Sequence, residues 1–174
     1  MTSATVTGLR MAESDCTSDI ETVALGLSKA WEFLSGEART FAPVPQSHDA
    51  LAVADFNFYI SLRLADASRR GGVGVLIQQA DAILVASNMF GVARQHIQHD
   101  DLRDACAEVC NVFTDCMATH FGGGQQVEIG LPCEAGPAQY QTFSESCVTR
   151  AVFEGCAGAR RLLVVLYDSL QLPS

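Results

Sequence analysis

Positive charge is scarce in this chain of 174 residues. It holds one lysine, Lys29, and ten scattered arginines against 20 acidic residues, so its formal net charge is -9. Binding to duplex nucleic acid depends on a basic footprint that releases counterions from the phosphates, and this chain offers none. Anionic membrane surfaces attract basic segments for the same reason. The composition therefore argues against nucleic acid and membrane surfaces as partners.

Long apolar runs are also missing. The longest mostly apolar stretches cover residues 80–92 and 162–167, well short of the roughly 20 residues that cross a bilayer. The N-terminal residues lack the apolar core of a signal peptide, so we expect a cytoplasmic protein. A chain of this length buries about 70% of its unfolded surface in one core. We expect a loose polar tail at residues 1–18 and a single domain at residues 19–174.

Cysteine is abundant, but its pattern supports neither disulfides nor metal. The seven cysteines are odd in number and no secretory signal precedes them, which favours reduced thiols. Cys106 and His120 bound the best zinc candidate, but on one helix they would lie about 21 Å apart, too far to share an ion. Cys156 lacks the arginine that follows the nucleophile of a cysteine phosphatase, and no Ser/His/Asp motif is present.

Hydrophobic periodicity predicts the secondary structure. Helices are predicted at 19–36, 80–91 and 100–121, and strands at 50–64, 73–77, 125–131, 146–154 and 160–169. Residues 40–49 and 132–141 contain prolines and are expected to be loops. The first two strands are joined too tightly for a parallel crossover. The pattern therefore predicts an α+β fold of two layers, in which helices pack on an antiparallel sheet. Both halves run from a helix to strands, which suggests a distant internal duplication.

The predicted helix at residues 100–121 has two distinct faces. Its broad apolar face holds Leu102, Ala105, Cys106, Val109, Val112, Phe113, Cys116 and Met117. The opposite side carries a narrow polar stripe, which we call the acidic stripe: Asp104, Glu108, Asn111 and Asp115. Acidic residues at 100 and 101 suit the positive end of the helix dipole, and the glycines at 122–124 end the helix.

Two explanations of the acidic stripe are open. The ordinary one is the solvated face that every amphipathic helix has. The other is a functional site, and two features favour it. Asn111 is a poor residue for the middle of a helix, and no lysine or arginine on the stripe pairs with the three acids. A partner outside the helix would then supply the counter-charge.

The segment from Asp104 to Asn111, Asp-Ala-Cys-Ala-Glu-Val-Cys-Asn, resembles the signature of the CheC/CheX/FliY family of chemotaxis phosphatases. That signature has Asp or Ser, three residues, Glu, two residues, Asn and a later proline. Here 20 residues separate Asn111 from Pro132, slightly fewer than in the family pattern. The resemblance spans residues 19–170 and is strongest to CheX, whose members carry one motif in the later helix. The first helix offers only Glu32 and Ser35, with Ser in place of Asn, so one site per chain is expected.

The resemblance implies a phosphatase that removes the aspartyl-phosphate of a CheY-like receiver domain, in chemotaxis or related two-component signalling. Asn111 would hold a water in line with the phosphorus, and Glu108 would pair with a lysine of the receiver. Asp104 and Asp115 are candidates for partner binding, or else solvated side chains. The enzyme would need no cofactor of its own, because the receiver brings Mg²⁺. The resemblance to CheX also implies a homodimer.

Two other hypotheses stay open at this stage. The same fold can serve as a non-catalytic module that binds a receiver or scaffolds a dimeric signalling complex. It can also be a sensor with a small-ligand pocket between helices and sheet, although the sequence shows no convergent polar cluster for one. Exposure of Glu108 and Asn111 side by side would favour a docking face, whereas their burial in internal hydrogen bonds would exclude it.

Overall fold

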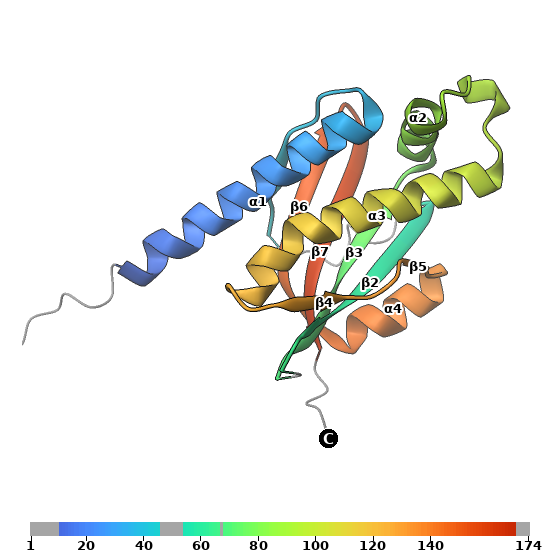
Figure 1. Ribbon diagram of the computed structural model, residues 1–174. Coiled ribbons are helices and arrows are strands. Elements are labelled where there is room, and N and C mark those ends of the chain that lie inside the picture. Colours follow the sequence, from blue (N-terminus) through green and yellow to red (C-terminus); the bar gives the residue numbers. More distant parts are fainter. Residues whose placement is uncertain (1–10, 46–53, 67, 170–174) are drawn as a thin grey trace, which may run out of the picture.

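The computed structural model describes residues 11–45, 54–66 and 68–169, which form four α-helices and seven strands (Figure 1). The helices are α1 (Met11–Ser35), α2 (Gln79–Phe90), α3 (His99–Gly122) and α4 (Pro137–Glu145), with a 3-10 helix at Arg94–His96. The strands are β1 (Phe41–Pro43), β2 (Phe56–Leu64), β3 (Arg70–Ile77), β4 (Val127–Ile129), β5 (Cys133–Glu134), β6 (Cys147–Ala157) and β7 (Arg160–Ser169). All strand pairs are antiparallel, and the sheet has the order β1-β6-β7-β3-β2-β4, with β5 also paired to β2.

Three helices pack on one face of this sheet. Figure 1 shows α1 and α3 crossing in front of the strands, and buried side chains of α1, α2 and α3 form one core with alternate strand residues. The largest fully buried members of this core are Trp31, Phe113, Phe121 and Phe153. A smaller cluster on the other face contains Leu76, Val152, Leu163, Val165 and Tyr167. The predicted α+β fold, an antiparallel sheet packed by helices, is confirmed.

Strand β2 shows how alternation divides the two faces. Phe58, Ile60 and Leu62 point toward the helices and are at most 3% exposed. Tyr59 and Ser61 lie between them in sequence and therefore point to the opposite face. The predicted strand is confirmed for residues 56–64, whereas residues 50–53 lie outside the described residues.

Helices α2 and α3 end at the predicted glycines. Gly91 and Gly123 follow them with φ angles of 64° and 55°, a left-handed conformation that glycine adopts without steric penalty. Helix α1 begins earlier than predicted, at Met11 rather than at Asp19. Residues 11–18 belong to this helix, and they contain no proline or glycine to stop it. Residues 1–10 lie outside the described residues. Within the described part of the chain, no helix is long and apolar enough to cross a membrane.

Two segments predicted as loops contain short regular elements, and proline is the reason for both errors. Pro137 is the first residue of α4, where its missing N–H is not needed by the helix. Pro43 ends β1, an edge strand that does not require every backbone donor. The sequence pattern interprets both prolines as breaks, whereas in the structure Pro137 begins a helix and Pro43 ends a strand. Strand β5 lies in the second of these segments as well.

A buried ion cluster ties α2 to the rest of the fold. Asp81, in the first turn of α2, is fully buried and accepts two hydrogen bonds from Arg39, of 2.9 and 2.7 Å. It accepts a third, of 2.7 Å, from Arg160 at the start of β7. The guanidinium of Arg39 also lies 4.4 Å from the ring centre of Trp31 on α1. Because buried charges are costly without partners, this cluster holds α1, α2 and β7 in one arrangement.

The topology contains an internal two-fold repeat. If α1, β1, β2 and β3 are exchanged with α3, β4, β6 and β7, the strand order is reversed but otherwise unchanged. The edge strands β1 and β4 pair with β6 and β2, which are equivalent under this exchange. Helices α1 and α3 therefore occupy equivalent places, and the internal duplication suggested by the sequence is present in the topology.

Candidate functional site

Helix α3 presents the acidic stripe because its other face is anchored in the core. The backbone N–H of Gln98 donates to Asp101 in a capping box that starts the helix. Cys106, Val109 and Phe113 are at most 1% exposed and pack toward the sheet. Since side chains on opposite sides of a helix diverge, the stripe faces away from the sheet.

Glu108 and Asn111 lie side by side on this outward face. The amide nitrogen of Asn111 donates a hydrogen bond of 3.3 Å to Glu108 Oε2, and both side chains are half-buried. Within the described residues, no arginine, lysine or histidine forms an ion pair with Glu108. The pair thus keeps one carboxylate oxygen and the amide oxygen of Asn111 available to an incoming group.

Asp104 lies one turn before Glu108, beside the proline that the sequence places far away. A cavity of about 540 Å³ is lined by Phe58, Asp100, Arg103, Asp104, Ala107, Pro132 and Glu134. Asp104 is exposed there, while Arg103 pairs with Glu134 across the cavity wall. Three carboxylates against one arginine leave this cavity net negative. The tertiary fold therefore brings Pro132 next to the first half of the acidic stripe.

Asp115 lies apart from this cavity. It lines a separate groove of about 260 Å³ between α1 and α3, together with Asp19, Gly26 and His120. At 1.5 Å per residue, Asp104 and Asp115 are roughly 16 Å apart along α3. The structure thus places Asp104 near Glu108 and Pro132, and Asp115 beside α1.

The cysteines next to the stripe are packing residues. Cys106 and Cys110 are fully buried. Burial raises the pKa of the Cys110 thiol to about 12, and burial, with the nearby carboxylate of Glu134, raises that of Cys106 still further. Thiols in this state are protonated at neutral pH and do not act as nucleophiles. Cys110 is therefore a core residue of α3.

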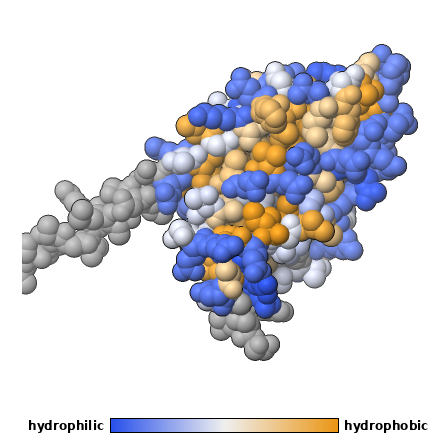
Figure 2. Space-filling model, viewed as in Figure 1, coloured by the Kyte–Doolittle hydropathy of each residue, from blue (hydrophilic) through white to orange (hydrophobic). Residues whose placement is uncertain are grey.

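Apolar surface that the sequence pattern does not predict accompanies the acidic stripe. Figure 2 shows hydrophobic surface on both sides of a hydrophilic band on the helical face. Phe33 and Leu25 of α1 are 81% and 56% exposed, and Leu131, directly before Pro132, is 87% exposed. Exposed apolar residues that border polar ones are typical of interaction surfaces. Leu131 belongs to the segment Ile129–Pro132, in which the family motif assigns a role only to Pro132.

The equivalent position on α1 lacks the amide. Gly36 and Gly123 both follow their helices with positive φ angles, and aligning them places Pro45 opposite Pro132. The same alignment puts Glu21 opposite Glu108, and Ala24, which is buried, opposite Asn111. Glu32 and Ser35, the partial match that the sequence offers on the first helix, lie elsewhere: Ser35 is the last residue of α1, and its hydroxyl binds the backbone of Glu37.

Comparisons with family models and with curated proteins find no match for this chain. Solved structures match it over most of its length. The chemotaxis protein CheX from Vibrio vulnificus aligns with a TM-score of 0.60 at 12% identity, covering 87% of this chain and 96% of that one. CheX in a complex with CheY, BeF₃ and Mg²⁺ from Borrelia burgdorferi gives 0.64 at 13%, covering 86% and 97%. FliY from Thermotoga maritima gives 0.56 at 13%, covering 95% and 93%. The chain therefore has the fold of the CheC/CheX/FliY family, as the resemblance of its motif predicted.

Proposed function

We propose that this protein is a phosphatase that hydrolyses the aspartyl-phosphate of a CheY-like receiver domain. The observation that carries the proposal is the pair of Glu108 and Asn111, side by side on an outward helix face and without a cation from the described residues. Solvation of a helix face alone does not explain why a carboxylate and an amide are paired there. A docking face for a positively charged partner explains it, since the partner then supplies the missing counter-charge.

Asn111 would act by positioning a water molecule. An acyl phosphate is an activated group, and the receiver contributes Mg²⁺ and a lysine to the phosphoryl oxygens. What is missing is a water held in line with the phosphorus. The carboxamide of Asn111 can accept and donate hydrogen bonds at once, so it can orient such a water without removing its proton. Holding a reactant in the attacking geometry lowers the barrier by replacing a chance encounter with a fixed one.

Glu108 has a different role in this proposal. Its carboxylate would bind the lysine of the receiver and set the register of α3 against the phosphorylation site. Its present hydrogen bond to Asn111 also orients the amide before the partner arrives. Asp104 and Asp115 lie on either side of this pair along the helix, each in a separate cavity or groove. There they would speed the approach of a basic partner surface more than they would strengthen its binding.

The partner is proposed from the comparisons as well as from charge. One of the matching structures is a CheX bound to CheY with BeF₃ and Mg²⁺, and BeF₃ has the geometry of a phosphoryl group. We extend this partner class to the present chain, with Mg²⁺ on the receiver and no cofactor on the phosphatase, and with chemotaxis or related two-component signalling as its setting. A homodimer belongs to the same proposal.

The test is dephosphorylation of a phosphorylated, Mg²⁺-bound receiver, with the receivers encoded in the same genome as substrates. We expect the wild-type chain to accelerate the loss of phosphate and Asn111→Ala to lose that acceleration by on the order of 100-fold. Gln95→Ala, which removes an exposed amide outside the stripe, is the matched control and keeps full activity. Equal acceleration by wild type and Asn111→Ala would exclude this role for the amide.

The alternative is a module that binds a receiver without catalysis, or that scaffolds a dimeric signalling complex. It differs from the proposal in one measurable respect. Binding of the receiver, measured by calorimetry, would weaken in Glu108→Gln, whereas the lifetime of its aspartyl-phosphate would stay at the spontaneous value with wild type. That combination would reject the phosphatase and retain the docking face.

A further inference from the structure

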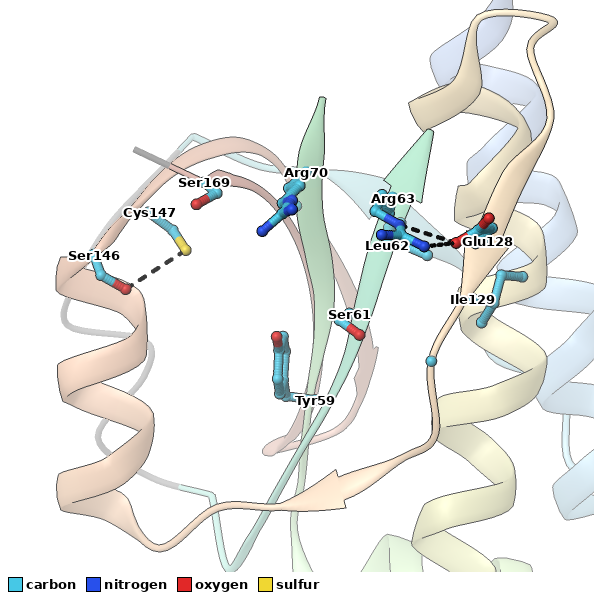
Figure 3. Close-up of a pocket in the computed structure, with 12 residues that line it drawn as sticks. Tyr59, Ser61, Leu62, Arg63, Arg70, Glu128, Ile129, Ser146, Cys147 and Ser169 are labelled. Carbon is cyan, nitrogen blue, oxygen red and sulfur yellow. Dashed lines mark hydrogen bonds and ion pairs between the residues drawn. The ribbon is translucent and has the colours of Figure 1, made fainter. Parts of the chain in front are cut away.

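A second cavity lies on the sheet face opposite to the acidic stripe. It has a volume of about 610 Å³, within the size range of small-molecule sites. Tyr59, Ser61 and Arg63 of β2 contribute to its floor, and Glu128 and Ile129 of β4 to one side. Ser146, which follows α4, and Cys147, which begins β6, line the other side (Figure 3). The residues Phe58, Ile60 and Leu62, which alternate with this floor, point to the helices instead.

Arg70 is exceptional among the arginines. Of the nine arginines in the described residues, eight form ion pairs: Arg39, Arg63, Arg69, Arg94, Arg103, Arg150, Arg160 and Arg161. Arg70 forms none with any described carboxylate, in a chain that has 20 acidic residues against 11 basic ones. Figure 3 shows its guanidinium directed into the cavity, above the hydroxyl of Tyr59.

The register of the sheet makes this isolation more pronounced. Arg63 and Arg70 are direct partners across β2 and β3, and like charges in this position repel each other. Glu128 neutralises Arg63 at the edge of the cavity. No described residue does the same for Arg70, so the cavity retains a positive charge that an anion would satisfy.

Hydroxyl groups surround this charge. Ser61, Ser146, Ser169 and Tyr59 line the cavity, and hydroxyls can donate to anionic oxygens. Burial raises the pKa values of Tyr59 and Cys147, so both stay protonated at neutral pH and add no negative charge. The Tyr59 ring packs against Gly72, where a Cβ atom would lie only 2.6 Å from a ring carbon. The ring of Tyr59 adds an apolar surface to the cavity.

We propose that this cavity binds a small organic anion, a carboxylate or a phosphate monoester with an apolar portion, and that Arg70 pairs with its charged group. The planar guanidinium binds either group through two parallel hydrogen bonds. The site is separate from Glu108 and Asn111 and does not rest on the proposed phosphatase activity. A ligand here would occupy the space between α4 and β4 and leave the helical face uncovered.

Calorimetric titration of the full chain tests the proposal with three probes: benzoate, phenyl phosphate and the neutral benzyl alcohol. We expect saturable binding of at least one of the two anions and much weaker binding of the alcohol. Which anion binds distinguishes a carboxylate site from a phosphate site. Arg70→Gln should weaken anion binding at least tenfold, because a charge-assisted hydrogen bond contributes about 1.5–3 kcal/mol.

Arg94→Gln is the matched control, since it removes an exposed arginine outside the cavity and should leave anion binding unchanged. Arg70→Gln breaks no ion pair among the described residues, so its thermal unfolding should match that of wild type. Amide shifts in nuclear magnetic resonance spectra should fall on β2, β4 and residues 146 and 147. Equal binding by wild type and Arg70→Gln, shifts confined to α3, or no saturable binding of either anion would each overturn the proposal.

Discussion

Replacing Asp81 by alanine is the sharpest test of how the fold is held together. Asp81 is completely buried and accepts hydrogen bonds from two arginines. The substitution leaves Arg39, whose side chain is 1% exposed, with a buried charge and no carboxylate. Breaking a buried pair in this way costs about 3–5 kcal/mol, because the remaining ion keeps its desolvation penalty without the compensating attraction.

The expected loss converts to a large change in thermal stability. For a chain of this size, 1 kcal/mol corresponds to about 2–4 °C in Tm, so Asp81→Ala should melt roughly 6–20 °C below wild type. Urea denaturation monitored by circular dichroism measures the free energy of unfolding directly. The slope with denaturant should stay constant, since the surface exposed on unfolding hardly changes.

The matched control is Glu128→Ala, which breaks an Arg–Glu pair whose two side chains are each 49% exposed. Exposed pairs contribute about 0–1 kcal/mol, so this variant should unfold close to wild type. Replacing both members of the buried pair, Arg39→Met with Asp81→Leu, should recover part of the loss, because no fully buried charge is left and the partly exposed Arg160 keeps its ion pair with Glu37. A cost below about 1 kcal/mol for Asp81→Ala would refute the view that this cluster fixes α2.

Three further predictions concern reactivity, docking and close packing. In the native state at pH 8, iodoacetamide should label the exposed Cys133 but not the buried Cys110. The pKa of Cys110, about 12, leaves only about one thiol in ten thousand ionised at this pH. Mass spectrometry at several pH values measures the labelling, and equal rates for the two cysteines would contradict the prediction. Leu131→Ser should weaken receiver binding without lowering Tm, because the side chain is 87% exposed; unchanged affinity in calorimetry would remove Leu131 from the docking surface. Gly72→Ala should destabilise the protein by about 1–3 kcal/mol in urea denaturation, since its Cβ would lie 2.6 Å from a carbon of the Tyr59 ring and 2.8 Å from the backbone oxygen of Ile60; wild-type stability would contradict this close packing.

Elements with a strong period were predictable from the sequence, and short or proline-marked ones were not. The alternation along β2 and the apolar face of α3 each repeat several times, so single exceptions do not obscure which residues are buried. Helix α4 has nine residues and begins at Pro137, which the sequence pattern interprets as a break. The early start of α1 was missed because a polar segment without proline or glycine extends a helix without showing a hydrophobic period.

The acidic stripe was predictable because its members lie on one helix. A spacing of three or four residues brings side chains to the same face whatever the helix packs against. This is why Glu108 and Asn111 are neighbours in the structure as they are in the pattern. Asp115 followed the same rule, yet the packing of α1 placed it in a different groove.

The periodic helices and strands, the acidic stripe and the excess of negative charge follow from local geometry and composition, so they can be predicted from the sequence. Three other features depend on the folded chain: Pro132 lies beside Asp104, Ala24 occupies the place equivalent to Asn111, and Arg70 faces a cavity without a described carboxylate partner. Pairing and burial of this kind depend on contacts between residues far apart in the chain. Strand register and helix packing set those contacts, and no local pattern contains them.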